Sequence, residues 1–226
     1  PDHDIIEITA DDRDTERGTT SRLLIGTKLT RDDLLRLALM SSENRAAHAL
    51  GRSYPGGLAE FVRAMNKKAK ALEMKSARFT EPTGLSSGNV ASANDLVKLV
   101  RAAAQDPLIR EYSTLPNHIV EVGDDLLEFK NSNSLVTKDD WRIALQKTGY
   151  TSDAGRCLVM TAFVQERPVV MILLNSVGKY TRIADARRVR SWMEAGSTSE
   201  RLASSPQPSF TPVSEKSERE AKAVAH

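Results

Sequence analysis

Two short motifs carry side chains suited to acyl-transfer chemistry. Ser42-Glu43-Asn44 follows an apolar run that ends at Met40-Ser41, and Lys147-Thr148-Gly149 ends the run Arg142–Gln146. A site that transfers an acyl group needs a hydroxyl that can pass a proton, an amide that orients its neighbours and a cation for a carboxylate. The two motifs contain all three groups, so they are the first candidates for a functional site.

Each motif also has an ordinary structural interpretation. Ser42 is a good N-cap for a helix, and Thr148-Gly149 is typical of a turn at the end of a strand. Average composition gives about one chance Ser-x-Asn in a chain of this size, and a chance Lys-Thr-Gly in about one such chain of twenty. The tripeptides alone therefore do not decide between a functional site and two structural features.

Helices are expected to position the first motif. Thr30 and Asp33 form a capping-box pattern that predicts the start of a core helix containing Leu34–Leu39. A second helix is expected from Ser42 to about Leu50, ended by the turn Tyr54–Gly57. Ser42 would then lie at the junction of two helices.

Two more helices and a loop follow. The third helix is expected to carry its apolar residues on one face, at Leu58, Phe61, Val62, Met65, Ala69 and Leu72. The composition of Phe79–Asn89 predicts a loop, and Ser92 is expected to cap a helix that ends near Ala104.

An antiparallel sheet is expected to position the second motif. A weak strand is predicted at Ile5–Thr9 and a β-ribbon at His118–Phe129. Three further strands, separated by short turns, are predicted at Arg142–Thr148, Arg156–Phe163 and Val169–Leu174. A closing helix is predicted at Tyr180–Glu194. Helices followed by an antiparallel sheet indicate the α+β class.

The wider sequence resembles the low-molecular-mass penicillin-binding serine D-Ala-D-Ala peptidases of peptidase family S11, and within them the D-alanyl-D-alanine endopeptidases. In penicillin-recognising enzymes Ser-x-Asn and Lys-Thr-Gly act together with a Ser-x-x-Lys. The resemblance covers residues 4 to about 195. It is carried by Gly18–Leu23, Leu39–Ala47, Phe79–Ser86, Lys147–Thr151, Ala154–Leu158 and Leu174–Tyr180. It implies a penicillin-binding protein/β-lactamase-like fold, with an antiparallel sheet flanked by helices plus a helical region.

The resemblance also implies roles for individual residues. Ser42 would relay a proton toward the leaving amine, and Asn44 would orient the active-site lysines and the substrate backbone. Lys147 would complete the electrostatic network and, with Thr148, anchor the substrate carboxylate. Gly149 and Tyr150 would contact the substrate, and the backbone N–H of Tyr150 would be one of two oxyanion-hole donors.

The nucleophile of the family has no counterpart here. The family places it in a Ser-x-x-Lys well before Ser-x-Asn, and none occurs between Pro1 and Ser42. We therefore expect Pro1 to be an internal position of a longer protein, and this chain to be inactive alone. Ser176-Val177-Gly178-Lys179 fits the pattern literally, but Gly178 disfavours the helical turn that would put Lys179 beside Ser176.

Composition limits the other possibilities. The chain has 226 residues, 40% hydrophobic and 27% charged, with a formal net charge of +2. The basic residues are scattered, so no nucleic-acid partner is indicated. The longest apolar run, Val169–Leu174, is too short to cross a bilayer. The single cysteine, Cys157, excludes an internal disulfide and is expected to be buried. The four histidines lack metal-ligand spacing, and no metal or cofactor is implied.

The combined expectation is a partial DD-peptidase catalytic domain at residues 1–196 and a disordered tail at 197–226. The complete protein would be a periplasmic serine endopeptidase or carboxypeptidase that cleaves peptidoglycan stem peptides and cross-links through an acyl-enzyme, and β-lactam antibiotics would acylate it. Two alternatives stay open: a non-catalytic peptidoglycan-binding relative and a β-lactamase. A class A β-lactamase needs a deacylating glutamate, and Glu81-Pro82-Thr83-Gly84 does not match that motif.

Overall fold

A capping box starts the helix that leads to the first motif. In the computed structural model, which describes residues 4–196, Thr30 Oγ1 accepts from the Asp33 N–H at 3.0 Å, and the Asp33 carboxylate accepts from the Thr30 N–H at 3.4 Å. Helix α1 (Arg31–Arg36) continues into a π-helical turn, η2 (Leu37–Ser41), and α2 (Asn44–Arg52) follows. Leu34, Leu37 and Met40 are fully buried, so this helical segment forms the centre of the first core.

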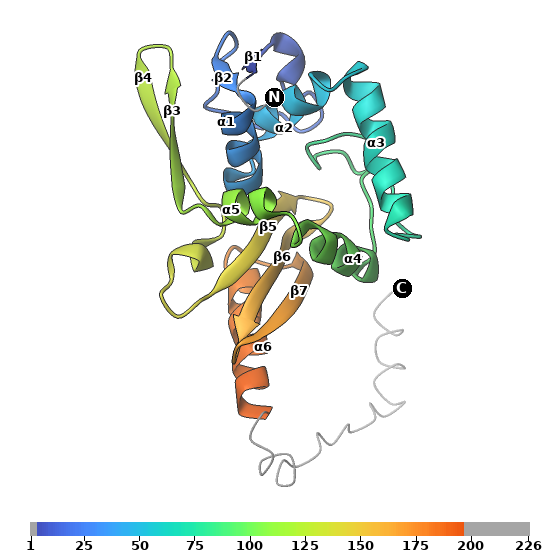
Figure 1. Cartoon of the computed structure of the whole chain (residues 1–226), viewed down its shortest axis with the longest axis vertical. Coiled ribbons are helices and arrows are strands. Elements are labelled where there is room, and N and C mark those ends of the chain that lie inside the picture. Colours follow the sequence, from blue (N-terminus) through green and yellow to red (C-terminus); the bar gives the residue numbers. More distant parts are fainter. Residues whose placement is uncertain (1–3, 197–226) are drawn as a thin grey trace, which may run out of the picture.

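Two small antiparallel pairs complete that core. The predicted strand β1 (Ile5–Glu7) pairs with β2 (Lys28–Thr30), which the sequence analysis did not predict. The predicted ribbon is the hairpin of β3 (Asn117–Val122) and β4 (Asp125–Lys130). Figure 1 shows this hairpin beside α1 at one end of the molecule. The buried cluster consists of Ile6, Ile8, Leu23, Leu29, Leu34, Leu37, Met40, Ala46, Ala49, Val120, Val122 and Phe129.

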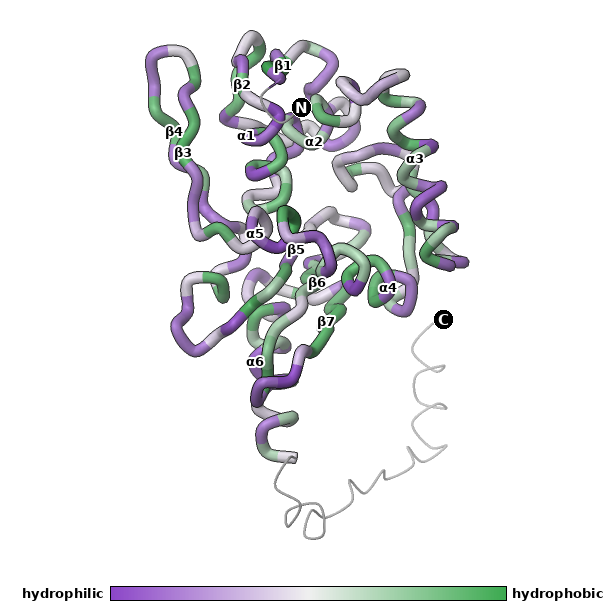
Figure 2. Tube along the Cα trace, viewed as in Figure 1, coloured by the Kyte–Doolittle hydropathy of each residue, from purple (hydrophilic) through white to green (hydrophobic). Residues whose placement is uncertain are grey.

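The main sheet is a three-stranded antiparallel meander, as predicted. Its order is β5-β6-β7, with β5 at Ile143–Thr151, β6 at Gly155–Val164 and β7 at Arg167–Ser176. Each strand is longer than predicted because pairing continues into the turn residues, as with Thr151 opposite Gly155. Figure 2 shows hydrophobic stretches along β6 and β7.

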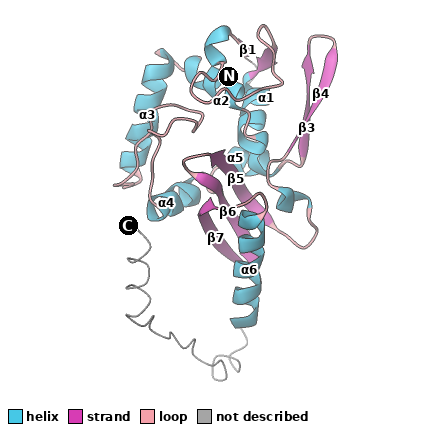
Figure 3. Ribbon diagram, turned by 180° about the vertical axis from the view of Figure 1, so that it is seen from behind, coloured by secondary structure: helices cyan, strands magenta, loops and turns pink. Residues whose placement is uncertain are grey.

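Helix α6 (Thr181–Gly196) covers one face of this sheet, where it packs on β6 and β7 (Figure 3). Alternate residues of β6 face the helix and form a second core with it. That core consists of Leu135, Trp141, Leu158, Met160, Ala162, Val164, Met171 and Ala186.

Helices α4 (Ala93–Ala103) and α5 (Pro107–Thr114) pack on the sheet away from α6, and α3 (Gly57–Ala71) packs against α2. Helix α3 starts after the predicted turn, the loop 79–89 follows, and Ser92 caps α4, which packs on β6 and β7. Helix α5 packs against β5 and was not predicted. Its signal was present, because Asp106 is the N-cap and Pro107 opens the first turn.

Two expectations from the sequence were wrong, and a third concerns residues outside the described range. The second helix begins at Asn44, and its N-cap is Glu43 rather than Ser42. Cys157 is partly exposed, because it lies on the sheet face opposite the α6 core. The predicted tail lies outside the described residues. Within residues 4–196, no helix has the length and apolar character of a membrane span.

Candidate functional site

The π-helical turn places Ser42 in an unusual backbone conformation. Ser42 has φ 62° and ψ 37°, in the left-handed region that non-glycine residues rarely adopt. The Leu37 carbonyl accepts from the N–H groups of Ser42 and Glu43 and from the Ser41 hydroxyl, which stabilises the end of the turn. π-Helical turns and strained residues of this kind occur frequently at functional sites.

The two motifs meet at this turn. Lys147 lies on β5, the edge strand of the main sheet, and its ammonium group donates to the Ser42 hydroxyl. Lys147 Nζ also donates to the Thr148 carbonyl at 2.7 Å, and Ser42 Oγ donates to the same carbonyl at 3.3 Å. Residues 105 positions apart in the chain therefore form one hydrogen-bonded group.

The electrostatics of this group favour proton exchange. Burial of the ammonium group, reinforced by the positive charge of Arg182, lowers the pKa of Lys147 to about 8. A lysine with a pKa near neutrality can both hold and release a proton under ordinary conditions. The hydroxyl of Ser42 is the group in contact with it.

The remaining residues of the second motif follow along β5. Thr148 is buried, and its hydroxyl donates to Ser132 Oγ at 2.6 Å. The Gly149 carbonyl accepts from Arg182 Nη1 at 2.9 Å. Tyr150 is 59% exposed, and the Arg156 guanidinium lies 4.3 Å from the centroid of its ring.

Asn44 is a predicted site residue that does not join the hydrogen-bonded group of Ser42 and Lys147. Its Nδ2 donates to Thr19 Oγ1 at 3.3 Å. Within residues 4–196, the structure pairs Asn44 with Thr19 and not with Lys147. Asn44 nevertheless lines the same cavity as Ser42 and Lys147.

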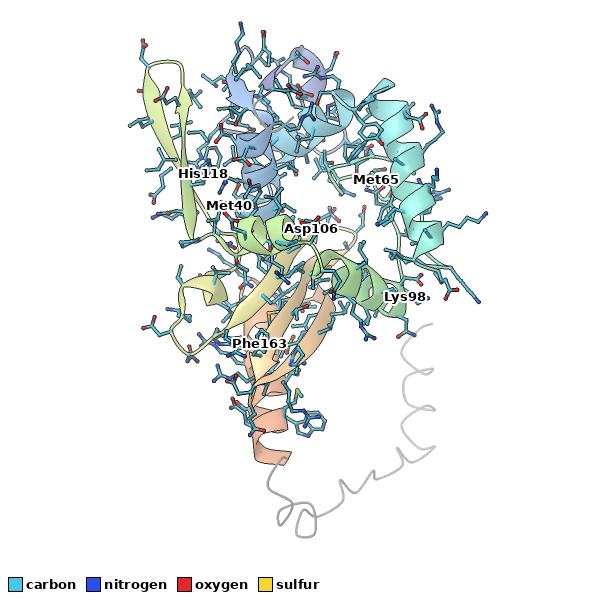
Figure 4. All side chains as sticks on the ribbon, viewed as in Figure 1. Met40, Met65, Lys98, Asp106, His118 and Phe163 are labelled. Atoms are coloured by element: carbon cyan, nitrogen blue, oxygen red, sulfur yellow. The ribbon has the colours of Figure 1, made fainter. Side chains whose placement is uncertain are left out.

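This cavity has a volume of about 710 Å³ and a mixed lining. Its polar side chains include Ser42, Asn44, Lys147, Thr148 and Arg182. Its apolar side chains come from the η2 turn, α3, α4, α5 and the sheet, and include Leu39, Met65, Leu96, Leu99, Val100, Ile109 and Val159. Figure 4 labels Met65, a lining residue on α3, and Met40, a core residue in the turn that precedes Ser42. The arrangement suits a ligand with one anionic end.

Sequence reasoning missed three residues of this site. Arg182 comes from α6, Thr19 from the N-terminal loop and Ser132 from the segment after β4. No motif singles out Arg182 or Ser132. Thr19 lies in a segment that carried the family resemblance, but it was not singled out. These side chains reach the site only through tertiary packing.

Other candidate chemistry is weaker. Ser176 ends β7, Gly178 has φ 86° and α6 begins at Thr181, so Ser176 and Lys179 do not share a helical turn. Among the described residues, no group of three His, Cys, Asp or Glu side chains is arranged to hold a metal ion.

A family model described as D-alanyl-D-alanine carboxypeptidase, peptidase S11, matches residues 2–178. The chain belongs to the S11 peptidase family. The D-alanyl-D-alanine endopeptidase of Pseudomonas aeruginosa is 46% identical over 198 residues, which are 87% of this chain and 64% of that protein. The D-alanyl-D-alanine endopeptidase of Escherichia coli is 48% identical over 182 residues, which are 80% of this chain and 59% of that protein.

The fold is also similar to that of a solved structure. The structure of penicillin-binding protein D2 from Listeria monocytogenes, in a cefotaxime-bound form, superposes with a TM-score of 0.73. The match covers 84% of this chain and 76% of that one, at 24% identity. The predicted S11 resemblance and the α+β penicillin-binding fold are both confirmed. The chain spans about three fifths of the length of its two S11 relatives from Pseudomonas and Escherichia.

Proposed function

We propose that this chain carries the substrate-orienting part of a serine-type D-alanyl-D-alanine endopeptidase or carboxypeptidase that acts on peptidoglycan outside the cytoplasmic membrane. The observation that carries the proposal is the contact between Lys147 and Ser42, which both line the cavity. The names of the S11 relatives supply the substrate class.

Ser42 and Lys147 form the proton-transfer pair. When the acyl-transfer intermediate collapses, its leaving amine must receive a proton. Ser42 and Lys147 both line the cavity, and Ser42 Oγ accepts from the Lys147 ammonium, so Ser42 can pass one proton to the amine and recover another from Lys147. A lysine with a pKa of about 8 is suited to this exchange.

Thr148, Lys147 and Arg182 form the binding group for the substrate carboxylate. These two cations and one hydroxyl line the same cavity, and a D-Ala C-terminus carries the carboxylate that they can bind. The backbone N–H of Tyr150, on the edge strand β5, is the proposed oxyanion donor from this chain. Asn44 orients the substrate backbone at the opposite wall.

The nucleophilic serine is assigned to a Ser-x-x-Lys outside this sequence, within the part of the relatives' length that the chain does not span. The test is the intact mass of this chain, and of the gene product extended upstream, after incubation with benzylpenicillin. A penicilloyl adduct on the extended protein alone supports the proposal. An adduct on the chain as given, whether or not the extended protein is also labelled, would move the nucleophile to Ser42 or Ser176.

One alternative is favoured by a specific observation. A peptidoglycan-binding relative without catalysis would use the same carboxylate site, formed by Lys147, Thr148 and Arg182. Absence of an adduct on both proteins, with retained binding of a D-Ala-D-Ala peptide, supports this binder. A β-lactamase is disfavoured, because the Glu81 carboxylate accepts from the Thr83 and Gly84 N–H groups, at 2.5 and 2.7 Å, and so belongs to the loop structure.

A further inference from the structure

Ser132 connects the two motifs although it belongs to neither. It follows β4 and is half-buried. Its main-chain N–H donates to the Met40 carbonyl at 2.8 Å, and its hydroxyl oxygen lies 3.1 Å from the same carbonyl. Met40 belongs to the π-helical turn and precedes Ser42 by two residues. Ser132 therefore anchors the backbone from which Ser42 projects.

The hydroxyl of Ser132 also contacts Thr148. Their two oxygens are 2.6 Å apart, and each hydroxyl has a single proton, so one proton lies between them. In one arrangement Thr148 donates to Ser132, and Ser132 donates to the Met40 carbonyl. In the other, Ser132 donates to Thr148, and the Thr148 proton turns into the cavity.

Reversal of this pair leaves the Met40 carbonyl with a hydrogen-bond donor. The Met40 carbonyl gives up the 3.1 Å contact to the Ser132 hydroxyl but keeps the shorter 2.8 Å bond to the Ser132 N–H. A buried carbonyl with one good donor is satisfied. The second arrangement therefore needs only an acceptor in the cavity for the Thr148 proton.

We propose that Ser132 is a positioning residue that turns the Thr148 hydroxyl toward a carboxylate in the cavity. This inference rests on the proposed function, in which Thr148 binds the substrate carboxylate. In the empty site both hydroxyl protons are used within the protein. When a carboxylate enters beside Lys147 and Arg182, it accepts a hydrogen bond from the Thr148 hydroxyl. The Ser132 hydroxyl then donates to the Thr148 oxygen from the protein side. Ser132 strengthens binding without touching the ligand.

The test is a double-mutant cycle in the upstream-extended protein, with Ser132→Ala and Thr148→Val. Ser132→Ala removes the hydroxyl but keeps the N–H that bonds Met40. The acylation rate is measured against benzylpenicillin concentration, which separates the apparent dissociation constant from the rate constant at saturation. We expect Ser132→Ala to raise the dissociation constant about fivefold and to leave the saturating rate constant unchanged. In the Thr148→Val background it should add nothing.

Two controls separate this role from a structural one. Benzylpenicillin methyl ester lacks the free carboxylate, so its acylation rate should be the same in wild type and Ser132→Ala. This comparison does not need Thr148→Val and so holds even if that variant does not fold. Ser134→Ala, at an exposed serine in the same segment, should leave both reactions unchanged. Three outcomes would overturn the role of Ser132 but not the proposed function. They are an equal effect of Ser132→Ala on the acid and the ester, an effect that adds to that of Thr148→Val, and no effect of Ser132→Ala on the dissociation constant. Absence of wild-type acylation would overturn the proposed function, and this inference with it.

Discussion

At the scale of single residues, the candidate site depends on one cation held in an unfavourable environment. The ammonium group of Lys147 is buried near the positively charged Arg182. It donates to neutral oxygens, the Ser42 hydroxyl and the Thr148 carbonyl. Its folded-state pKa of about 8 lies below that of a lysine in the unfolded chain. This lowered pKa has a measurable consequence for stability.

Between pH 8 and roughly 10.5 the unfolded chain binds more protons at Lys147 than the folded chain, so stability rises with pH in this window. Below pH 8 the penalty for the buried ammonium is complete. Relative to Lys147→Met, wild type should therefore gain about 1–3 kcal/mol of unfolding free energy between pH 7.5 and 10.5. Urea unfolding at a series of pH values checks this. Lys130→Met, at an exposed lysine, is the control and should show no such trend.

The fold itself does not require a glycine at position 149. Its φ is not positive, and a Cβ added there would meet only the Cys157 Cβ, at an ordinary 3.8 Å. Gly149 lines the cavity, and in the proposed function the substrate backbone lies along β5 there. An added methyl group at Gly149 would therefore contact the substrate.

We therefore expect Gly149→Ala to fold with a melting temperature within a few degrees of wild type, and to lower acylation of the upstream-extended protein by benzylpenicillin at least about tenfold. Gly155→Ala is the matched opposite. Gly155 has φ 64°, and a Cβ there would lie 2.6 Å from Asn175 Oδ1, so stability should fall by about 2 kcal/mol or more. If Gly149→Ala is acylated at the wild-type rate, the proposed path of the substrate along β5 is wrong.

At the scale of secondary-structure elements, one buried carboxylate joins the N-terminal segment to the helix of the first motif. Asp12 Oδ1 lies 2.7 Å from His48 Nδ1, and Oδ2 accepts from Arg52 Nη2 at 2.9 Å, both on α2. Burial alone raises the pKa of Asp12. The hydrogen bonds from His48 and Arg52 outweigh that effect and hold the pKa well below its usual range.

Asp12→Asn should lower the unfolding free energy by about 2–4 kcal/mol, because it removes one member of a buried ionic group. Because the pKa is lowered on folding, the contribution of Asp12 is complete above about pH 4 and declines as the pH falls below it. The difference between wild type and Asp12→Asn should therefore narrow toward pH 2. Asp11→Asn, at an exposed neighbour, should change stability by less than about 0.5 kcal/mol. Similar losses for both variants would show that Asp12 has no special role.

At the scale of the whole molecule, one arginine joins three segments around the cavity. Arg17 lies in the N-terminal loop. Its guanidinium donates to the Leu85 carbonyl at 2.5 Å, to Ser152 Oγ at 3.0 Å and to Asp153 Oδ2 at 2.5 Å. Leu85 belongs to the loop that borders the cavity, and Ser152 and Asp153 form the β5–β6 turn. The side chain thus connects the first core region with the main sheet.

Arg17→Ala should increase hydrogen–deuterium exchange in the loop 79–89 and in the turn 151–155 by about three- to tenfold, because both lose a shared donor. Exchange in β6 should stay unchanged, since that strand is the centre of the sheet. Arg13→Ala, at an exposed arginine of the same loop, is the control. Faster exchange throughout the molecule would indicate general destabilisation rather than a local connection.

Local patterns in the sequence were sufficient for most of the elements. The capping box at Thr30, the cap at Ser92, the meander and the hairpin were all predicted, because each depends on residues a few positions apart. The missed α5 carried the same kind of signal, at Asp106 and Pro107. The missed β2 has only three residues, and it exists because β1 supplies its partner.

The sequence by itself determined the family, the α+β class and the two motifs, since these depend on residue identity and short spacing. Only the tertiary structure decided which groups meet. The contact of Lys147 with Ser42, the lowered pKa of Lys147, and the positions of Arg182 and Ser132 all arise from segments far apart in the chain. The burial that changes a pKa and the distance that allows a proton to pass depend on packing between elements, and no local pattern specifies that packing.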